Sequence, residues 1–108
     1  MDDREFQRHT EEAVTVLHRL LTVAADDYGF EVGVHDGALT VRFPSPPVSV
    51  EVGPHRHTRQ VWVSTKSKTF KLDWDEVEAA FILAATGESL REVVERVIGA
   101  VLKEDFSL

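Results

Sequence analysis

The chain has 108 residues, 43% of them hydrophobic and 29% charged, a mixture typical of one globular domain rather than of a disordered segment. It contains no cysteine, which excludes disulfides, thiolate metal sites, cysteine nucleophiles and iron–sulfur clusters held by the chain itself. Its formal net charge of −7 argues against non-specific nucleic-acid binding, which needs Lys and Arg for the phosphates, and favours cations or basic protein surfaces as partners.

The N-terminal part predicts an amphipathic helix from Glu5 to about Ala24. Apolar residues recur there at the three-to-four spacing of one helical face, namely Phe6, Ala13, Leu17, Leu20, Leu21 and Ala24. Asp2 and Asp3 add negative charge at the helix N-terminus, where the helix dipole favours it.

Residues 30–43 predict a β-hairpin, because apolar residues occupy every second position on both sides of an Asp-Gly pair. The alternating residues are Phe30, Val32 and Val34, followed by Leu39, Val41 and Phe43. Asp36 and Gly37 suit a tight turn between them, since both tolerate the positive φ angles that such a turn requires.

Three further strands are predicted by the same alternation. They contain Val48, Val50 and Val52, then Val61 and Val63, then Phe70, Leu72 and Trp74. Pro44, Pro46 and Pro47 are expected to interrupt the sheet before the first of these, because proline donates no backbone hydrogen bond. The stretch from Asp75 to Ala85 is ambiguous between a helix and a short strand around Ala80 to Ala84.

The C-terminal part predicts a second helix, introduced by a capping box of Ser89 and Glu92. Its apolar face consists of Leu90, Val93, Val94, Val97, Ile98, Val101 and Leu102. Two amphipathic helices that bracket antiparallel strands can both bury their apolar faces on one side of the sheet. We therefore predict a single domain over residues 1–108, with an α+β fold: a two-layer α/β sandwich whose antiparallel sheet of five to six strands packs against N-terminal and C-terminal helices.

Motifs for export, membrane insertion and catalysis are not visible in the sequence. It shows neither a secretory signal nor an apolar run of the roughly 20 residues that a membrane span needs. It also lacks a nucleotide-binding glycine loop, a zinc motif and a nucleophile elbow, and its acidic residues show no spacing that dictates an acid–base pair. We expect a cytoplasmic protein without catalytic residues that binds neither nucleic acid nor membranes.

Four segments resemble the frataxin family, and together they span nearly the whole chain. They are Asp3, Glu5, Phe6 and Arg8; Gly37 to Val41; Gln60 to Thr65; and Gly87 to Leu90. The block from Gln60 is the most specific, because frataxins present a Gln, an aliphatic residue, a Trp and a small residue in that order. The resemblance also implies a strand near Phe81, where the family usually has a Trp.

The resemblance implies a non-catalytic protein of iron–sulfur cluster assembly that contacts the cysteine desulfurase and the scaffold protein. Iron (Fe2+/Fe3+) would be bound weakly by carboxylates, whose oxygens suit such a cation. The candidate metal residues are Asp2, Asp3, Glu5, Glu11, Glu12, Asp26, Asp27 and Glu31, and the candidate partner-binding residues are Gln60, Trp62 and Ser64. We expect a monomer, with an iron-dependent oligomer as the alternative.

The chain departs from the family in its first helix, where the acidic ridge of frataxins is interrupted by His18, Arg19, Thr22 and Val23. Iron would therefore bind nearer the start of the helix and in the loop before the first strand.

Ferrous oxidation has been attributed to members of the family, but no motif here supports it. His55 and His57 are expected to face solvent rather than to ligate a metal.

The alternative function is a small acidic adaptor or chaperone-like protein-binding module without a role in iron metabolism. Its contact surface would combine an aromatic residue with basic ones on the sheet side, namely Trp62, Arg56, Arg59, Lys66, Lys68 and Lys71.

Overall fold

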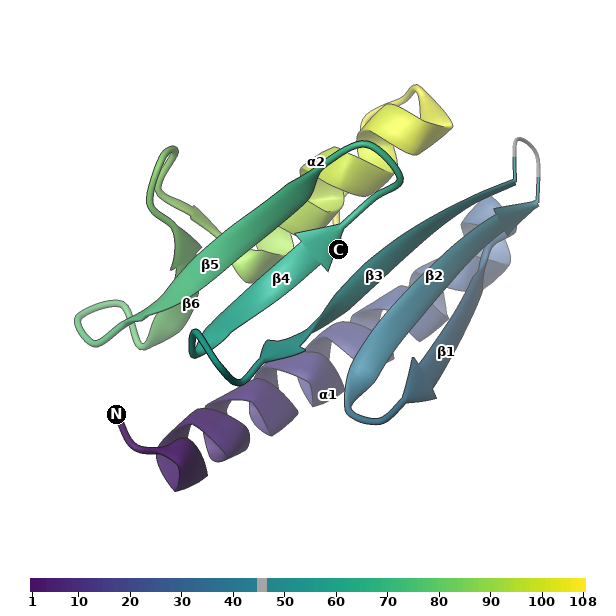
Figure 1. The fold of residues 1–108 in the computed structure, drawn as a ribbon. Helices are drawn as coiled ribbons and strands as arrows, with labels where there is room; N and C mark the ends of the chain where they lie inside the picture. The colour runs from purple at the N-terminus through teal and green to yellow at the C-terminus, as the bar shows by residue number, and fades with distance from the viewer. Residues whose placement is uncertain (45–46) are drawn as a thin grey trace.

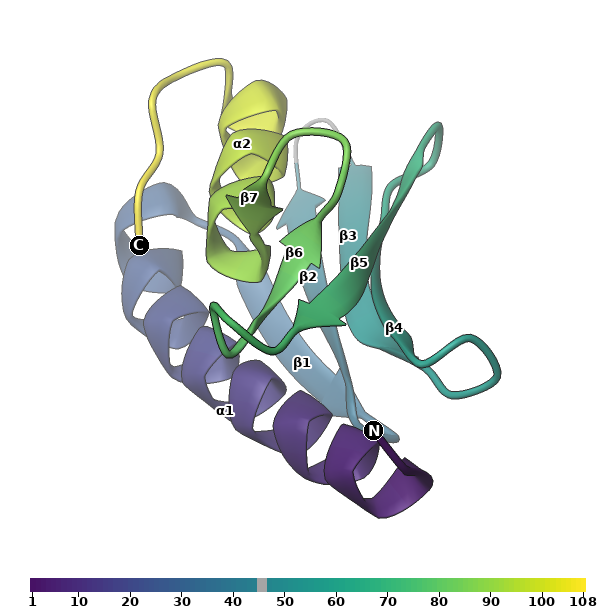
Figure 2. The same cartoon turned by 90° about the vertical axis from the view of Figure 1, so that its left-hand side faces the viewer.

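The structure is a computed structural model that describes residues 1–44 and 47–108, and it shows two helices packed on one antiparallel sheet (Figure 1). The helices are α1 (Asp3–Tyr28) and α2 (Leu90–Leu102); the strands are β1 (Glu31–His35), β2 (Ala38–Pro44), β3 (Pro47–His55), β4 (Gln60–Ser64), β5 (Thr69–Asp75), β6 (Ala80–Leu83) and β7 (Glu88–Ser89). Each strand pairs with its sequence neighbour, in the order β1 to β7. Both helices cover the same face (Figure 2), which confirms the predicted two-layer α+β sandwich and corrects the strand count to seven.

Helix α1 is longer than its apolar pattern predicts. Asp2 caps its start, because the carboxylate accepts a hydrogen bond from the backbone N–H of Glu5 at 2.8 Å. The helix ends at Gly29, whose left-handed conformation (φ 71°) directs its N–H to the carbonyl of Ala25. Asp26 and Asp27 therefore lie in the last turn of the helix and not, as the sequence predicted, in a loop before the first strand.

The sheet confirms the hairpin predicted over residues 30–43 and resolves the ambiguous stretch. Asp36 and Gly37 have φ angles of 51° and 80° and form the turn between β1 and β2. Residues 80–83 form strand β6, as the family resemblance implied. One expectation needs correction: Pro44 and Pro47 do not interrupt the sheet but pair with each other at the end of the β2–β3 ladder, while Pro46 lies outside the described residues. Strand β3 also extends beyond the predicted valines to His55.

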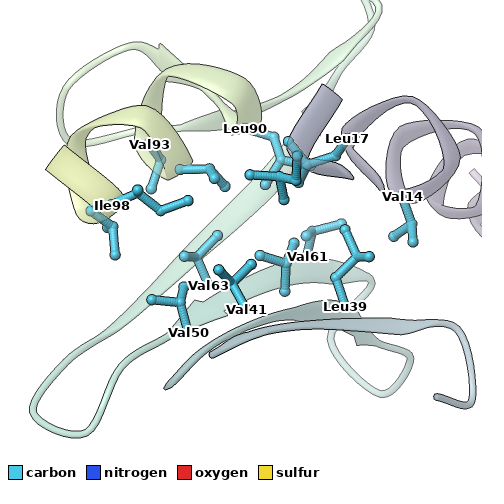
Figure 3. Close-up of a cluster of buried hydrophobic side chains, with 14 of the residues drawn as sticks. Val14, Leu17, Leu39, Val41, Val50, Val61, Val63, Leu90, Val93 and Ile98 are labelled. Atoms are coloured by element: carbon cyan, nitrogen blue, oxygen red, sulfur yellow. The ribbon is translucent and has the colours of Figure 1, made fainter. Parts of the chain in front are cut away.

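The core lies between the sheet and the two helices (Figure 3). Inward residues of the strands, among them Leu39, Val41 and Val63, are fully buried against residues such as Leu17 of α1 and Ile98 of α2. Each fully buried Val or Leu side chain stabilises the fold by about 1.5–3 kcal/mol. The alternation of these residues along the strands leaves the opposite face of the sheet free for other contacts.

Helix α2 begins as predicted, and a C-terminal tail follows it. Ser89 Oγ accepts a hydrogen bond from the backbone N–H of Glu92, and the Glu92 carboxylate accepts one from the N–H of Ser89. Residues 103–108 then run beside the two helices (Figure 2), and Phe106 is buried there. The sequence did not predict this tail as part of the core. Over the part of the chain that the structure describes, neither helix is long and apolar enough to cross a membrane.

Candidate functional site

The three predicted partner-binding residues lie on one surface, the outer face of the sheet. Gln60, Trp62 and Ser64 alternate along β4 with Val61 and Val63, which are 0% exposed because they point toward the helices. The three outward residues are half-buried. The structure thus brings the predicted group together on a single face, away from the helix layer. Whether this group contacts a partner stays a prediction.

The indole of Trp62 is held by side chains from three neighbouring strands. The imidazole of His55 on β3 stacks on it with ring centroids 3.8 Å apart and an interplanar angle of 2°. Lys71 on β5 places its Nζ 4.8 Å from the ring centroid, a cation–π contact. The indole Nε1 donates to Gln60 Oε1 at 3.0 Å, and Gln60 Nε2 donates to the carboxylate of Asp73 at 3.1 Å. We call these five residues the Trp62 cluster.

Asp73 was missed by the sequence analysis, Lys71 was named only with the alternative contact surface, and His55 was placed wrongly. Lys71 lies directly opposite Trp62 and Asp73 opposite Gln60, so a hairpin register drawn from the turn at residues 65–68 would have found both. His55 was expected to face solvent and is instead half-buried against Trp62, with its Nδ1 2.8 Å from Thr58 Oγ1. Its position depends on β3 extending further than the valine pattern indicates.

The eight candidate metal residues fall into two groups at opposite ends of α1. Asp2, Asp3, Glu5, Glu11 and Glu12 occupy its first turns, whereas Asp26, Asp27 and Glu31 lie at its far end and on β1. With a rise of 1.5 Å per residue, Asp3 and Asp27 are separated by about 36 Å. The eight carboxylates therefore do not form one site.

Several carboxylates of the N-terminal group already have protein partners. Asp2 caps the helix, and Asp3 pairs with Arg59 at 2.8 Å. Glu11 accepts a hydrogen bond from Gln7 Nε2 at 3.1 Å. A cation that bound these groups would have to replace the existing contacts, which lowers the net gain from binding.

The group at the far end of α1 is less engaged. The last turn of α1, which lies wholly within the described chain, contains Asp26 and Asp27 but no basic residue. Both carboxylates are exposed beside the negative end of the helix dipole, so a cation there would relieve repulsion. Among residues 1–44 and 47–108, however, no three acidic or histidine side chains are close enough to hold a metal ion together. The donors suit a weakly held, hydrated cation and do not fit a tightly coordinated one.

The basic residues of the alternative contact surface are only partly gathered by the fold. Lys71 contacts the indole of Trp62, but Arg59 is paired with Asp3 at the start of α1. Lys66 and Lys68 lie in the exposed turn between β4 and β5, and Arg56 lies in the turn after β3. The structure therefore places one of the five cations on Trp62.

Comparison with known proteins identifies relatives of one kind. A family model described as a frataxin-like domain matches residues 1–104. The iron-sulfur cluster assembly protein CyaY of Stutzerimonas stutzeri (strain A1501) is 34% identical over 74 residues, covering 67% of this chain and 66% of that protein. The CyaY protein of Ectopseudomonas mendocina (strain ymp) is 31% identical over the same length and with the same coverage. The match thus spans slightly less than two thirds of these relatives' length.

A solved structure supports the same assignment at the level of the fold. Frataxin from Psychromonas ingrahamii superposes with a TM-score of 0.76 at 17% identity, and the match covers 99% of this chain and 97% of that one. The superposition and the family model over residues 1–104 agree with each other. This chain belongs to the frataxin-like family.

Proposed function

We propose that this protein is a non-catalytic, cytoplasmic accessory of iron–sulfur cluster assembly that docks on a complex of cysteine desulfurase and scaffold protein. Family membership supports the pathway, since the relatives are named iron-sulfur cluster assembly proteins. The observation that carries the proposal is the Trp62 cluster, an indole on the open face of the sheet that is fixed by stacking and by a hydrogen bond.

The physical argument rests on the low cost of using a side chain that is already ordered. Tryptophan is enriched among the residues that dominate binding energy, and its truncation there costs about 2 kcal/mol or more. His55, Lys71 and Gln60 hold the indole before any partner arrives, so less conformational entropy is lost on docking. The half-buried Gln60 and Ser64 on either side supply polar groups that can fix the orientation of the partner.

The test is a calorimetric titration against the cysteine desulfurase of the same organism, at low and at moderate salt. We expect Trp62→Ala to weaken binding about thirtyfold, which corresponds to the loss of one dominant interface residue. Trp62→Phe keeps an aromatic ring but loses the hydrogen-bond donor to Gln60. Its affinity should lie between those of wild type and Trp62→Ala. Val77→Ser, at a 93% exposed site in the turn between β5 and β6, is the control. Equal affinity for wild type and Trp62→Ala would refute docking through this cluster.

We further propose that iron is carried weakly at the carboxylates that flank the C-terminal end of α1. Asp26, Asp27 and Glu31 are exposed there, and the net charge of −7 draws cations to the surface.

Restoring acidic residues on the interrupted part of the helix, by His18→Glu with Arg19→Glu, should tighten both iron and desulfurase binding. Unchanged affinity for both would eliminate a role for this helix surface. Sedimentation with and without iron would test whether the protein stays a monomer.

The second candidate is an acidic protein-binding adaptor without an iron role. It is favoured by one observation, that the described residues contain no set of three metal-binding side chains while Asp3 and Glu11 are already engaged. Titration with ferrous iron, followed by amide resonances, separates the two. An iron carrier as proposed should lose signals near residues 26–31 first, and signals lost first near residues 2–12 would move the site to the start of α1. An adaptor should show only diffuse effects that disappear with salt.

A further inference from the structure

A groove in the helix layer, on the opposite side of the molecule from the Trp62 cluster, is not used by the proposed function. It encloses about 320 Å³, which is within the range of ligand-binding clefts. Its apolar walls include Ala13, Val16 and Leu20 from α1 and, across the groove, Trp74, Phe81 and Leu90. Val16 is 50% exposed at its edge, so the apolar surface continues outward from the groove along α1.

The outward edge of the groove is a regular stripe along α1. Val16, Leu20 and Val23 follow one another at spacings of four and three residues, which aligns them on one side of the helix. Val23 is 71% exposed and Val16 half exposed. Single exposed valines are ordinary, but a row of apolar residues beside an apolar groove forms a contiguous patch of the kind that marks an interaction site. The same spacing continues to Glu12 at one end of the row and Asp27 at the other.

The neighbouring space between the helices already holds an apolar segment of the chain itself. The C-terminal tail runs beside α1 and α2 (Figure 2), with Phe106 against Tyr28 at a centroid distance of 4.9 Å. Glu95 accepts a hydrogen bond from the backbone N–H of Leu108 at 2.7 Å, and Arg91 donates to the Leu108 carbonyl. The helix layer can therefore accommodate an added apolar segment that is fixed by polar contacts at its edge.

The charge at the two ends of the stripe is negative, whereas the exposed Arg19 lies beside its centre, between Val16 and Val23. Arg91 lines the groove, but it is engaged by the Leu108 carbonyl and lies 3.7 Å from the carboxylate of Glu95. Within the described part of the chain, Glu12 and Asp27 have no ion-pair partner. These two carboxylates, about 22 Å apart along the helix, are left to meet an incoming partner.

The stripe does not suit a second copy of this chain. A parallel pairing of two stripes would place Glu12 against Glu12 and Asp27 against Asp27, and an antiparallel pairing would place Glu12 against Asp27. Both arrangements bring like charges together, which opposes association. We propose instead that the groove and the stripe bind a segment of a partner protein with an apolar centre and a Lys or Arg at each end. This surface is separate from the Trp62 cluster, and it shares only Asp27 with the proposed iron site.

A designed peptide tests the proposal, with Trp74 as the reporter. The probe is a helix-forming peptide of about four turns, with leucines at the spacing of the stripe and a lysine pair at each end. Trp74 lines the groove, and in a Trp62→Phe background it is the only indole of the protein. We expect the peptide to change the emission of Trp74. The matched peptides carry glutamate pairs in place of the lysines, or serines in place of the leucines, and should bind much more weakly.

Variants of the stripe show whether binding occurs where we propose. Val16→Ser with Val23→Ser should lower the affinity for the lysine peptide about tenfold, because apolar contact area is lost, whereas Val77→Ser should leave that affinity unchanged. Glu12→Gln with Asp27→Asn should lower the affinity for the lysine peptide and reduce the salt dependence of its binding. The proposal is overturned if the lysine peptide does not bind, if its serine version binds equally well, or if the valine and the charge variants both bind like wild type. Self-association of the wild type that the valine change abolishes would also overturn it.

Discussion

Gly53 on β3 lies directly opposite Trp62, and the structure leaves no room there for a side chain. A Cβ at this position would be 2.8 Å from the Cβ of Ala38 on β2. Gly53→Ala therefore forces β2 and β3 apart beside the Trp62 cluster, and we expect it to lower the free energy of unfolding by about 1–3 kcal/mol. Urea denaturation measures this loss.

The matched controls for Gly53→Ala separate crowding from the general effect of alanine in a strand. Gly33→Ala on β1 meets nothing within 4 Å, so it should leave stability unchanged or raise it slightly. Combining Gly53→Ala with Ala38→Gly removes the opposing Cβ and should restore part of the lost stability. A Gly53→Ala protein as stable as wild type would contradict the close approach of the two strands.

Glu88 joins β7 to α2 through an ion pair with Arg96, whose Nε and an Nη each lie 2.9 Å from a carboxylate oxygen. Hydrogen bonds from Arg96 and then Thr86 hold the pKa of the Glu88 carboxyl below its usual value of 4.5. A carboxyl whose pKa is lower in the folded state stabilises the fold above its unfolded pKa, and this contribution is lost as the pH falls through the folded value.

The consequence is a stability difference that depends on pH. At neutral pH, wild type should be more stable than Glu88→Gln by less than about 1 kcal/mol, because the pair is partly exposed. The difference should shrink as the pH falls below 4.5, where the unfolded chain takes up a proton first. Thermal unfolding at several pH values measures it, and Glu78→Gln, in the turn between β5 and β6, controls for the loss of one negative charge. A difference that grows in acid would contradict the sign of the shift.

At the scale of the element, α1 has an unfavourable charge distribution at its C-terminal end. Asp26 and Asp27 lie beside carbonyl groups that already carry partial negative charge. Asp26→Asn with Asp27→Asn should therefore raise the free energy of unfolding by about 0.3–1 kcal/mol in the absence of metal. Glu11→Gln with Glu12→Gln, in the first half of the helix, is the matched control and should not stabilise. If the aspartates hold iron, their replacement should also remove any increase in Tm that ferrous iron causes.

The elements that the sequence predicted well are those whose signal is local. Alternating valines and leucines define the strands because one face of each strand is buried, and the Ser89–Glu92 capping box defines the start of α2 within four residues. The end of α1 was missed because Asp26 and Asp27 are unfavourable at a helix C-terminus, although Ala25 and Tyr28 beside them pack against the core. The end of the helix is set by the left-handed conformation of Gly29. Strand β7 has two residues, too few to show any alternation.

The candidate site was predictable to the same extent. The strand pattern alone predicts that Gln60, Trp62 and Ser64 share a face, because they occupy alternate positions of one strand. The stacking of His55 on Trp62 depends on β3 extending to His55 and on its register with β4, which a valine pattern that ends at Val52 does not show. The acidic residues were selected by their number, and the length of α1 separates them into two groups; whether either group binds a cation stays a prediction.

For the molecule as a whole, the C-terminal tail joins elements that are far apart in the chain. Phe106 is 8% exposed and packs edge-on against Tyr28 at the end of α1 and Phe30 before β1. The tail also lies close to α2, because Glu104 donates its N–H to the carbonyl of Gly99 at 3.2 Å. The tail thus covers the end of the core where α1, α2 and the first hairpin meet.

Phe106→Ala should consequently destabilise the whole fold. We expect a loss of about 3 kcal/mol, the usual cost of removing a buried phenylalanine, and a decrease in Tm of more than about 10 °C for a domain of this size. Ser107→Ala, at the exposed neighbouring position, should have little effect in the same calorimetric experiment. If Phe106→Ala and Ser107→Ala both had the Tm of wild type, the tail would not contribute to the stability of the core. A large loss with a single cooperative transition would show that the tail belongs to the same folding unit as the sheet, because an independently detached segment would not lower the stability of the remaining core.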